Sequence, residues 1–318
     1  MFRRRPVPAR KAGETAVNAH SHATGLQKWL GHLAMMLFAA LIAGSFTLGA
    51  LTAPHIGAAP ITAARFLLGT AVMVLVVAMT VRDGLRWPRQ AWRFLVLGGL
   101  MGVYFVAMFI ALGMASPVSL GAIFTLNPFF SAIFGFLLLR QVPRPVVLGS
   151  LAIAASGALW IIFRGDLDAM LRFEIGRGEL IYLAGVICHA AYAPLVRRFS
   201  KGEPVTVSTL WSVTATALLV SLYGWNGIRE TDWSGLPAIV WFAIAYLGIV
   251  TTAFTLFLLQ FASLRLPAAK VFAYGYLTPA FIIALEGIAG HGWAPPVVMT
   301  GALFIVLGLV VLALTPDG

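Results

Sequence analysis

Few side chains in this sequence could do chemistry, and the ionisable ones among them lie within long apolar runs. Arg65 could hold a carboxylate through two parallel hydrogen bonds, or it could be a structural arginine bonded to backbone carbonyls. Glu286 could carry a coupling proton if burial keeps it protonated, or it could be solvated at a membrane interface. Since ionisable groups inside apolar runs are costly, each of them is a functional hypothesis.

His189 lies in the middle of another apolar run, one helical turn before Tyr192. The two side chains could line a binding site, or His189 could be a hydrogen-bonded packing residue. Lys270 is only a few residues from the end of its run, so we expect its ammonium group to snorkel to the membrane surface. For Tyr104 and Thr251, helical phase alone does not say whether they face a cavity.

The embedded groups do not form an enzyme site or a metal site. Metal or aspartyl chemistry needs clustered acids and histidines, whereas this sequence scatters one glutamate, one central histidine and the lone Cys188 over different runs. A single cysteine also excludes an internal disulfide. We therefore expect no catalytic residue, no bound metal and no cofactor, and an intramembrane enzyme is a disfavoured alternative.

The composition excludes a soluble globular protein. Of 318 residues, 60% are hydrophobic and only 10% are charged, whereas a soluble domain has about 25% charged residues. Because a membrane helix needs about 20 apolar residues, the sequence predicts an all-α membrane protein with ten transmembrane helices. The runs are 32–52, 60–81, 94–113, 118–139, 145–163, 179–196, 205–224, 238–261, 268–288 and 295–314.

The distribution of Lys and Arg predicts how the chain is oriented. With alternating loops, 16 of the 22 basic residues fall on one side, two lie within runs, and the other side holds only Arg164, Arg172, Arg177 and Arg229. Basic loops stay in the cytoplasm, so both termini should be cytoplasmic, in an inner or plasma membrane. The net charge of +11 then reflects topology and contact with the lipid bilayer rather than nucleic-acid binding.

Two parts of the sequence match without gaps at an offset of 151 positions. Residues 122–157 match 273–308 at Ala122 and Ala273, Leu126 and Leu277, Pro128 and Pro279, Phe130 and Phe281, Pro145 and Pro296, and Gly157 and Gly308. The repeating unit has five helices, and an odd number reverses the direction of the second copy. The fold class is therefore predicted as two inverted five-helix repeats, an arrangement typical of secondary transporters.

The paired prolines mark the expected binding region. Pro145 and Pro296 open their helices, where a missing N–H has no cost. Pro128 and Pro279 fall near the middle of their runs, where each should kink its helix and free a backbone carbonyl. Polar residues gather beside both, so we predict a substrate site lined there by Thr125, Asn127, Tyr274 and Tyr276. The alternative is that the prolines only shape helix packing.

The chain after residue 32 resembles the EamA-type members of the drug/metabolite transporter superfamily. The motifs that carry the resemblance are Gly44-Ser45-Phe46 with Pro60 and Arg65, the helix from Ala122 through Pro128, and Gly178-Glu179-Leu180 with Cys188-His189-Ala190-Ala191-Tyr192 and Arg197-Arg198. The resemblance implies a secondary transporter, frequently an exporter of amino acids or other small metabolites.

Together these observations predict four segments. A basic cytoplasmic tail (1–31) precedes the first five-helix repeat (32–163), and an extracytoplasmic loop (164–178) leads to the second (179–314). We expect alternating-access transport of a small molecule, with a site formed by Arg65, His189 and Tyr192 and the residues around Pro128 and Pro279. Protons are a candidate coupling ion. A membrane sensor or scaffold that binds a ligand without moving it is the alternative.

Overall fold

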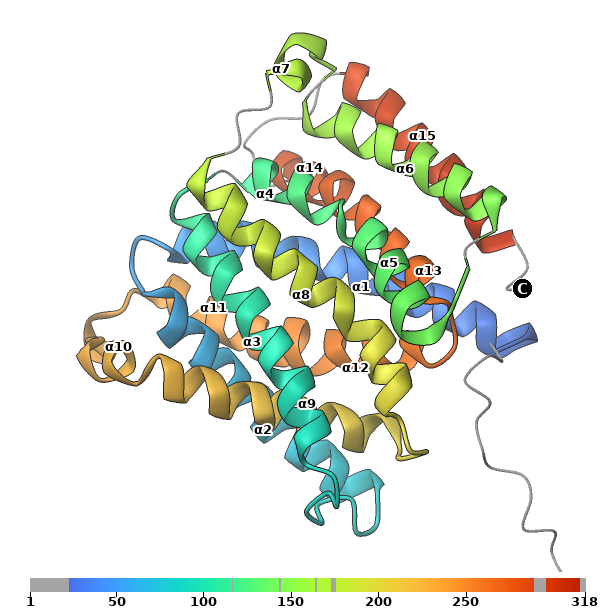
Figure 1. Cartoon of the computed structure of the whole chain (residues 1–318). Coiled ribbons are helices and arrows are strands. Elements are labelled where there is room, and N and C mark those ends of the chain that lie inside the picture. Colours follow the sequence, from blue (N-terminus) through green and yellow to red (C-terminus); the bar gives the residue numbers. More distant parts are fainter. Residues whose placement is uncertain are drawn as a thin grey trace, which may run out of the picture.

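The computed structural model describes residues 23–115, 117–142, 144–163, 165–172, 176–288 and 296–314, and every regular element in these ranges is a helix. The helices form one bundle, in which α1 lies between the other helices in Figure 1. Since membrane interiors offer no hydrogen-bond partner for backbone groups, helices that satisfy their own backbone are what such apolar segments must form. The predicted all-α class is confirmed.

The helices of the first half begin at Gly25. They are α1 (Gly25–Thr52), α2 (Ala58–Thr80), α3 (Trp92–Leu112), α4 (Pro117–Phe124), α5 (Asn127–Leu139) and α6 (Pro145–Ile162), followed by the short α7 (Leu167–Leu171).

The second half begins with α8 and contains two irregular helical segments. Its elements are α8 (Arg177–Phe199), α9 (Val205–Tyr223), α10 (Trp225–Glu230), the 3₁₀ turn η1 (Trp233–Gly235), α11 (Ala238–Gly248), the π-helix η2 (Ile249–Phe254), α12 (Thr255–Ser263), α13 (Ala268–Ala273), the 3₁₀ helix η3 (Tyr274–Leu277), α14 (Thr278–Ile288) and α15 (Pro296–Leu314).

Six segments are long and apolar enough to cross a membrane. They are α1, α2, α3, α8, α9 and the continuous segment from α11 through α12, which runs from Ala238 to Ser263. The other four predicted spans coincide with shorter apolar helices, at Asn127–Leu139, Pro145–Gly157, Lys270–Leu285 and Met299–Leu312. The prediction of a membrane protein is confirmed, and the count of ten spans stays a prediction.

We expected the two central prolines to kink continuous helices. Instead, each proline lies at the start of a new helix. In the first half, α4 ends at Phe124 and α5 begins at Asn127, so Pro128 is the second residue of α5. In the second half, α13 gives way to η3, and α14 begins at Thr278 with Pro279 second. Proline has no N–H to donate and its φ angle suits the first turn, so an interruption costs less than a kink.

The packing pattern repeats when each helix is exchanged for its counterpart in the other half. The helix α3 packs against α8, and correspondingly α12 packs against α1; α5 packs against α8, and α14 against α1. The helices α2 and α9 are counterparts of each other, as are α6 and α15, and the two members of each pair pack together. Such exchange is what a two-fold relation between two copies of one helical unit produces.

The helices α6 and α15 run side by side along one edge of the bundle (Figure 1). Their contact depends on the two glycines that the internal repeat pairs. A Cβ on Gly157 would lie 2.5 Å from the carbonyl oxygen of Gly301, and one on Gly308 would lie 2.7 Å from that of Ser150. Glycine is required at both positions because the two backbones approach so closely.

Candidate functional site

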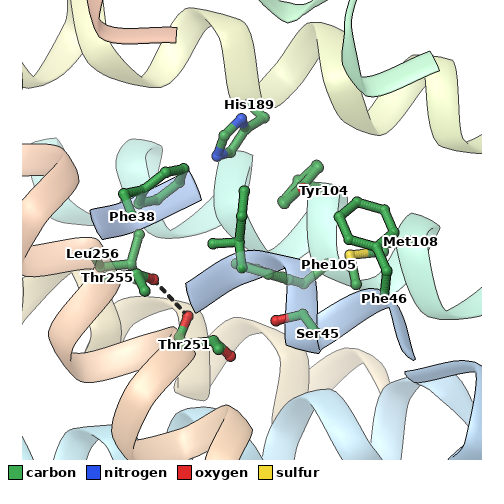
Figure 2. A pocket seen from close by; sticks show the side chains of 11 residues that line it. Phe38, Ser45, Phe46, Tyr104, Phe105, Met108, His189, Thr251, Thr255 and Leu256 are labelled. Atoms are coloured by element: carbon green, nitrogen blue, oxygen red, sulfur yellow. Dashed lines mark hydrogen bonds between the residues drawn. The ribbon is translucent and has the colours of Figure 1, made fainter. Parts of the chain in front are cut away.

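A small cavity of about 20 Å³ lies in the bundle between the two halves. This volume accommodates about one water molecule, so the bundle is nearly closed around it. Figure 2 shows the side chains that surround it, with His189 of α8 opposite the threonines of η2 and α12. The lining residues are Phe38, Ile42, Ser45, Phe46, Tyr104, Phe105, Met108, His189, Thr251, Thr255 and Leu256.

Helical spacing brings these residues to one place. On α1, Phe38, Ile42 and Ser45 follow one another at steps of four and three residues, and therefore share a face. On α3, Tyr104 and Met108 are one turn apart, as are Thr251 and Thr255 on the second-half segment. The lining combines aromatic faces with hydroxyls and one imidazole, and it has no acidic side chain among the described lining residues.

His189 connects the cavity to the interruption between α4 and α5. Its side chain is 3% exposed, and its ring stacks on that of Tyr104 with centroids 4.2 Å apart and an interplanar angle of 26°. The amide nitrogen of Asn127 lies 2.6 Å from the Nδ1 atom of His189. When this amide donates to Nδ1, the neutral imidazole has its proton on Nε2. The predicted residues Asn127 and His189 are thus brought together.

Arg65 is fully buried and lies directly behind the cavity wall. Its Nε atom donates to the hydroxyl of Thr252 at 2.9 Å, and its Nη2 atom donates to the hydroxyl and carbonyl oxygens of Thr251 at 2.9 and 3.1 Å. The guanidinium carbon lies 4.2 Å from the centre of the Phe105 ring. Because Thr251 and Phe105 both line the cavity, one layer of side chains separates Arg65 from it.

The partners of Arg65 belong to the π-helix η2, which sequence reasoning did not predict. Within and beside it, the hydroxyl of Thr251 donates to the carbonyl of Leu247 at 3.1 Å, and that of Thr255 donates to the carbonyl of Thr251 at 2.8 Å. A π-helical turn inside an α-helix is often found at functional sites. Its wider turn has no residue signature, so only the structure reveals it.

Two of the predicted tyrosines lie in hydrogen-bonded pairs and do not line the cavity. The hydroxyl of Tyr192 accepts from the amide of Gln260 at 2.8 Å, and this amide also contacts the hydroxyl of Ser212 at 3.2 Å. The hydroxyl of Tyr274 lies 3.0 Å from Nδ1 of His32 on α1. Neither tyrosine is among the residues that surround the cavity.

The remaining predicted residues are buried beside the interruptions. Thr125, Pro128, Tyr276 and Pro279 lie in the interior without lining the cavity. Glu286 is on α14, and its side chain is outside the described part of the structure. Of the predicted site residues, His189 alone is among the described lining residues.

We expected the ammonium group of Lys270 to snorkel to the membrane surface, but the side chain is buried. Its side chain is only 1% exposed, on the short helix α13. The helix packs against α5 and α8, so the side chain is covered by neighbouring helices before it reaches a surface. The proximity of Lys270 to a span end therefore did not decide where its ammonium group lies.

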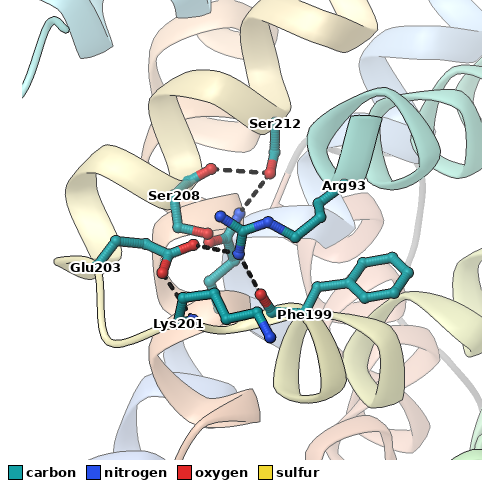
Figure 3. A network of polar contacts seen from close by, with 7 residues as sticks. Arg93, Phe199, Lys201, Glu203, Ser208 and Ser212 are labelled. Carbon is teal, nitrogen blue, oxygen red and sulfur yellow. Dashed lines mark hydrogen bonds and ion pairs between the residues drawn. The ribbon is translucent and has the colours of Figure 1, made fainter. Parts of the chain in front are cut away.

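A second polar cluster joins the start of α3 to the loop between α8 and α9 (Figure 3). The Nη1 atom of Arg93 lies 2.9 Å from Oε1 of Glu203 and also donates to the carbonyl of Phe199. The backbone N–H of Lys201 donates to Oε2 of Glu203 at 2.7 Å. Since both charged side chains are largely buried, this ion pair fixes the loop to α3.

The described residues contain six segments of membrane-spanning length, and four of these segments line an internal cavity, so the fold is that of an integral membrane protein. The EamA-like transporter family model matches residues 29–163 and 176–314, once for each half. The chain therefore belongs to the EamA-like transporter family, as its motifs indicated, with two repeats.

Two bacterial relatives are similar over much of their length. The Bacillus subtilis (strain 168) protein "Uncharacterized transporter YyaM" is 27% identical over 289 residues, which covers 87% of this chain and 92% of the relative. "Uncharacterized transporter YcxC" of the same organism is 24% identical over 209 residues, covering 62% and 64%. Both names agree with a membrane transporter.

A solved structure described as "Crystal structure of protein" has the same fold. It superposes with a TM-score of 0.70 at 22% sequence identity, covering 90% of this chain and 95% of the other. At this identity the likeness concerns the fold, so it adds nothing about the substrate.

Proposed function

We propose that this transporter moves a small metabolite across an inner or plasma membrane by alternating access, most simply as an exporter of an amino acid or a related compound. The observation that carries the proposal is the cavity between the two halves, lined from α1, α3, α8 and the η2–α12 segment. A substrate site near the midplane, where two repeats meet beside discontinuous helices, suits a transporter that opens to either side in turn.

The substrate would contact the lining around His189 in an enlarged form of this cavity. The interruption at Pro128 adjoins it, because Asn127, the first residue of α5, is hydrogen-bonded to His189, which lines the cavity. Helices that are already interrupted can change direction there without breaking further backbone hydrogen bonds. We therefore assign Asn127 and His189 to the site and the two proline positions to the hinges.

The proposal includes ten spans in two inverted repeats, with both termini in the cytoplasm. Inversion gives the two halves equivalent packing on opposite sides of the membrane, which agrees with the exchangeable contacts of α3 with α8 and α12 with α1. Two ways of driving transport are compatible with this proposal. One is exchange for protons, with Glu286 as the candidate proton carrier, and the other is facilitated efflux. Equal pH dependence of transport in wild type and Glu286→Gln would remove that candidate.

The test is untargeted efflux from proteoliposomes. Vesicles with the purified protein are loaded with a whole-cell metabolite extract, and mass spectrometry follows what leaves, with and without a pH gradient, against protein-free vesicles. Selective release of one metabolite class would support transport. Release equal to that of protein-free vesicles, from folded protein, would contradict it and favour a sensor or scaffold.

Two variants connect this efflux to the cavity. His189→Phe keeps an aromatic ring against Tyr104 and removes the hydrogen bond to Asn127, so we expect at least about a tenfold slower efflux, the effect of roughly 1.4 kcal/mol. Gly149→Ala is the matched control, because a Cβ there has no neighbour within 4 Å. Equal efflux rates in the two variants would place the pathway elsewhere.

A further inference from the structure

The buried guanidinium of Arg65 has no acidic partner in the part of the chain that the structure describes. Its hydrogen bonds go to the two threonines of η2, which are neutral. Its Nη1 atom is buried and has no hydrogen-bond partner among the described residues. A charge inside the membrane is normally paired, so an unpaired one beside a cavity requires an explanation.

The sequence offers hardly any counter-charge for it. The chain has 11 acidic residues, and the ten apolar runs contain two of them, Glu179 and Glu286, both near the level of the second span's outer end. The helix of Glu179, α8, is not among the main neighbours of α2. The helix of Glu286, α14, packs against α1, α4 and α6, and α2 is not among its main neighbours. The positive charge of Arg65 is therefore balanced chiefly by dipoles and by the faces of Phe66 and Phe105, with guanidinium-to-centroid distances of 5.6 and 4.2 Å.

The positive charge of Arg65, which has no acidic partner among the described residues, acts on the cavity. Phe105 and Thr251 lie between Arg65 and the cavity. Each of them contacts the guanidinium group and also lines the cavity. Where water is excluded, a charge acts strongly over one side-chain layer. A cation in the cavity is repelled, and no described lining residue is an acid that could offset the repulsion. An anion is attracted, and Nη1 of Arg65, which has no hydrogen-bond partner among the described residues, is the donor available to it.

We propose that the transported substrate presents a carboxylate group, on a body that packs against the aromatic lining, and that Arg65 supplies the counter-charge of this carboxylate. This inference rests on the proposed function, since it assigns the substrate class of the same cavity. The bonds from Nε and Nη2 hold the guanidinium in place, while Nη1 remains for the ligand. Arginine suits this double task because its planar fork offers five donors.

The test uses three probes with one shape and three charges: 3-phenylpropanoate, 3-phenylpropanamide and 3-phenylpropylammonium. Their dissociation constants for the purified full-length protein are measured from the rise of the unfolding temperature with probe concentration. We expect the carboxylate to bind about tenfold more tightly than the amide, because a charge-assisted hydrogen bond is about twice as strong as a neutral one. The ammonium should bind most weakly.

Substitutions separate the charge of Arg65 from its structural bonds. In Arg65→Gln the three probes should bind within about twofold of one another, whereas Arg65→Lys keeps the charge and should still favour the carboxylate over the ammonium. Thr252→Val is the matched control, because it removes the acceptor of Nε and leaves the charge in place. It should keep the order of the probes even if its unfolding temperature falls.

Several outcomes would overturn the inference. It fails if wild type binds the three probes equally, binds none of them, or favours the ammonium, and it fails if Thr252→Val loses the charge preference as fully as Arg65→Gln. If Arg65→Gln does not fold, the wild-type series and Arg65→Lys still decide. Efflux of a metabolite that has no carboxylate or other anionic group would leave the proposed transport function intact and contradict only the inferred role of Arg65.

Discussion

Asn127 at the start of α5 and His189 in the middle of α8 lie 2.6 Å apart, side chain to side chain, and they belong to different repeats. Both side chains are buried, and the ring of His189 also contacts that of Phe272 on α13, with centroids 4.9 Å apart. A direct polar bond thus joins the helix interruption of one repeat to the first helix of the other. Movement of α5 relative to α8 at this point would stretch or break it.

The two side chains should be energetically coupled. In a double-mutant cycle of Asn127→Ala and His189→Phe, we expect a coupling energy between about 0.6 and 1.7 kcal/mol, the average and the maximum measured for hydrogen bonds between membrane helices. The free energy of unfolding in mixed detergent micelles gives the values. As a control, His189→Phe should be additive within about 0.5 kcal/mol with the exposed Thr80→Val on α2. Additivity in both cycles would show that the bond contributes nothing.

The ion pair of Arg93 and Glu203 should matter for stability because it is largely shielded from solvent. Their side chains are 8% and 18% exposed, against 80% and 56% for Arg86 and Asp83. Glu203→Gln should lower the free energy of unfolding by about 1–3 kcal/mol, since it leaves a desolvated arginine without its charged partner. Asp83→Asn should change it by less than about 1 kcal/mol.

Salt provides a second check on the same pair. Exposed charges are screened by ions, whereas buried ones are much less so. The loss caused by Glu203→Gln should therefore persist when unfolding is measured in high salt. If the loss disappears there, Arg93 and Glu203 interact as an ordinary surface pair.

The contact of α6 with α15 should not tolerate a methyl group at its closest points. Gly157→Ala and Gly308→Ala place a Cβ 2.5 and 2.7 Å from backbone oxygens, so each should cost about 1–3 kcal/mol of unfolding free energy. Gly149→Ala, on the exposed side of α6, should leave stability equal or slightly higher because alanine favours helix. Equal melting temperatures for all three would mean that the two helices separate readily.

The proposed topology can be tested with reporter fusions. A reporter that is active only outside the cytoplasm should be inactive when fused in the loop 82–91 and active when fused in 165–171 or 231–237. A cytoplasmic fluorescent reporter should give the reverse pattern. The same side for 82–91 and 165–171 would exclude the ten-span arrangement.

The helices could be predicted from the sequence, and their inward faces could not. Continuous apolar runs determine where a membrane helix forms, and the proline pair at positions 128 and 279 located both interruptions within a few residues. However, a helix that is apolar on all sides has no amphipathic pattern to orient it. For this reason Phe38, Ser45 and Phe105 gave no signal that they line a cavity.

Polar residues were also hard to place from sequence alone. Tyr192 and Tyr274 stood beside the expected site by position, yet each is used in a separate pair, with Gln260 and His32. Such partners are distant in the chain and meet only through tertiary packing. Arg65 was recognised as a buried charge, but its dependence on a π-helix could not be read from any local pattern.

The bonds of Arg65 also have a consequence for how the chain is made. Its partner Thr251 is synthesised 186 residues later, which takes roughly 10–40 s at about 5–20 residues per second. During that interval α2 must enter the bilayer with a charge that its later partners do not yet cover. Because Arg65 is the eighth residue of α2 and lies towards the outer end, its insertion costs less than the about 2.5–3.5 kcal/mol of an arginine at a helix centre. The other residues of α2 are almost all apolar, and this composition must offset the charge until the second half of the protein arrives.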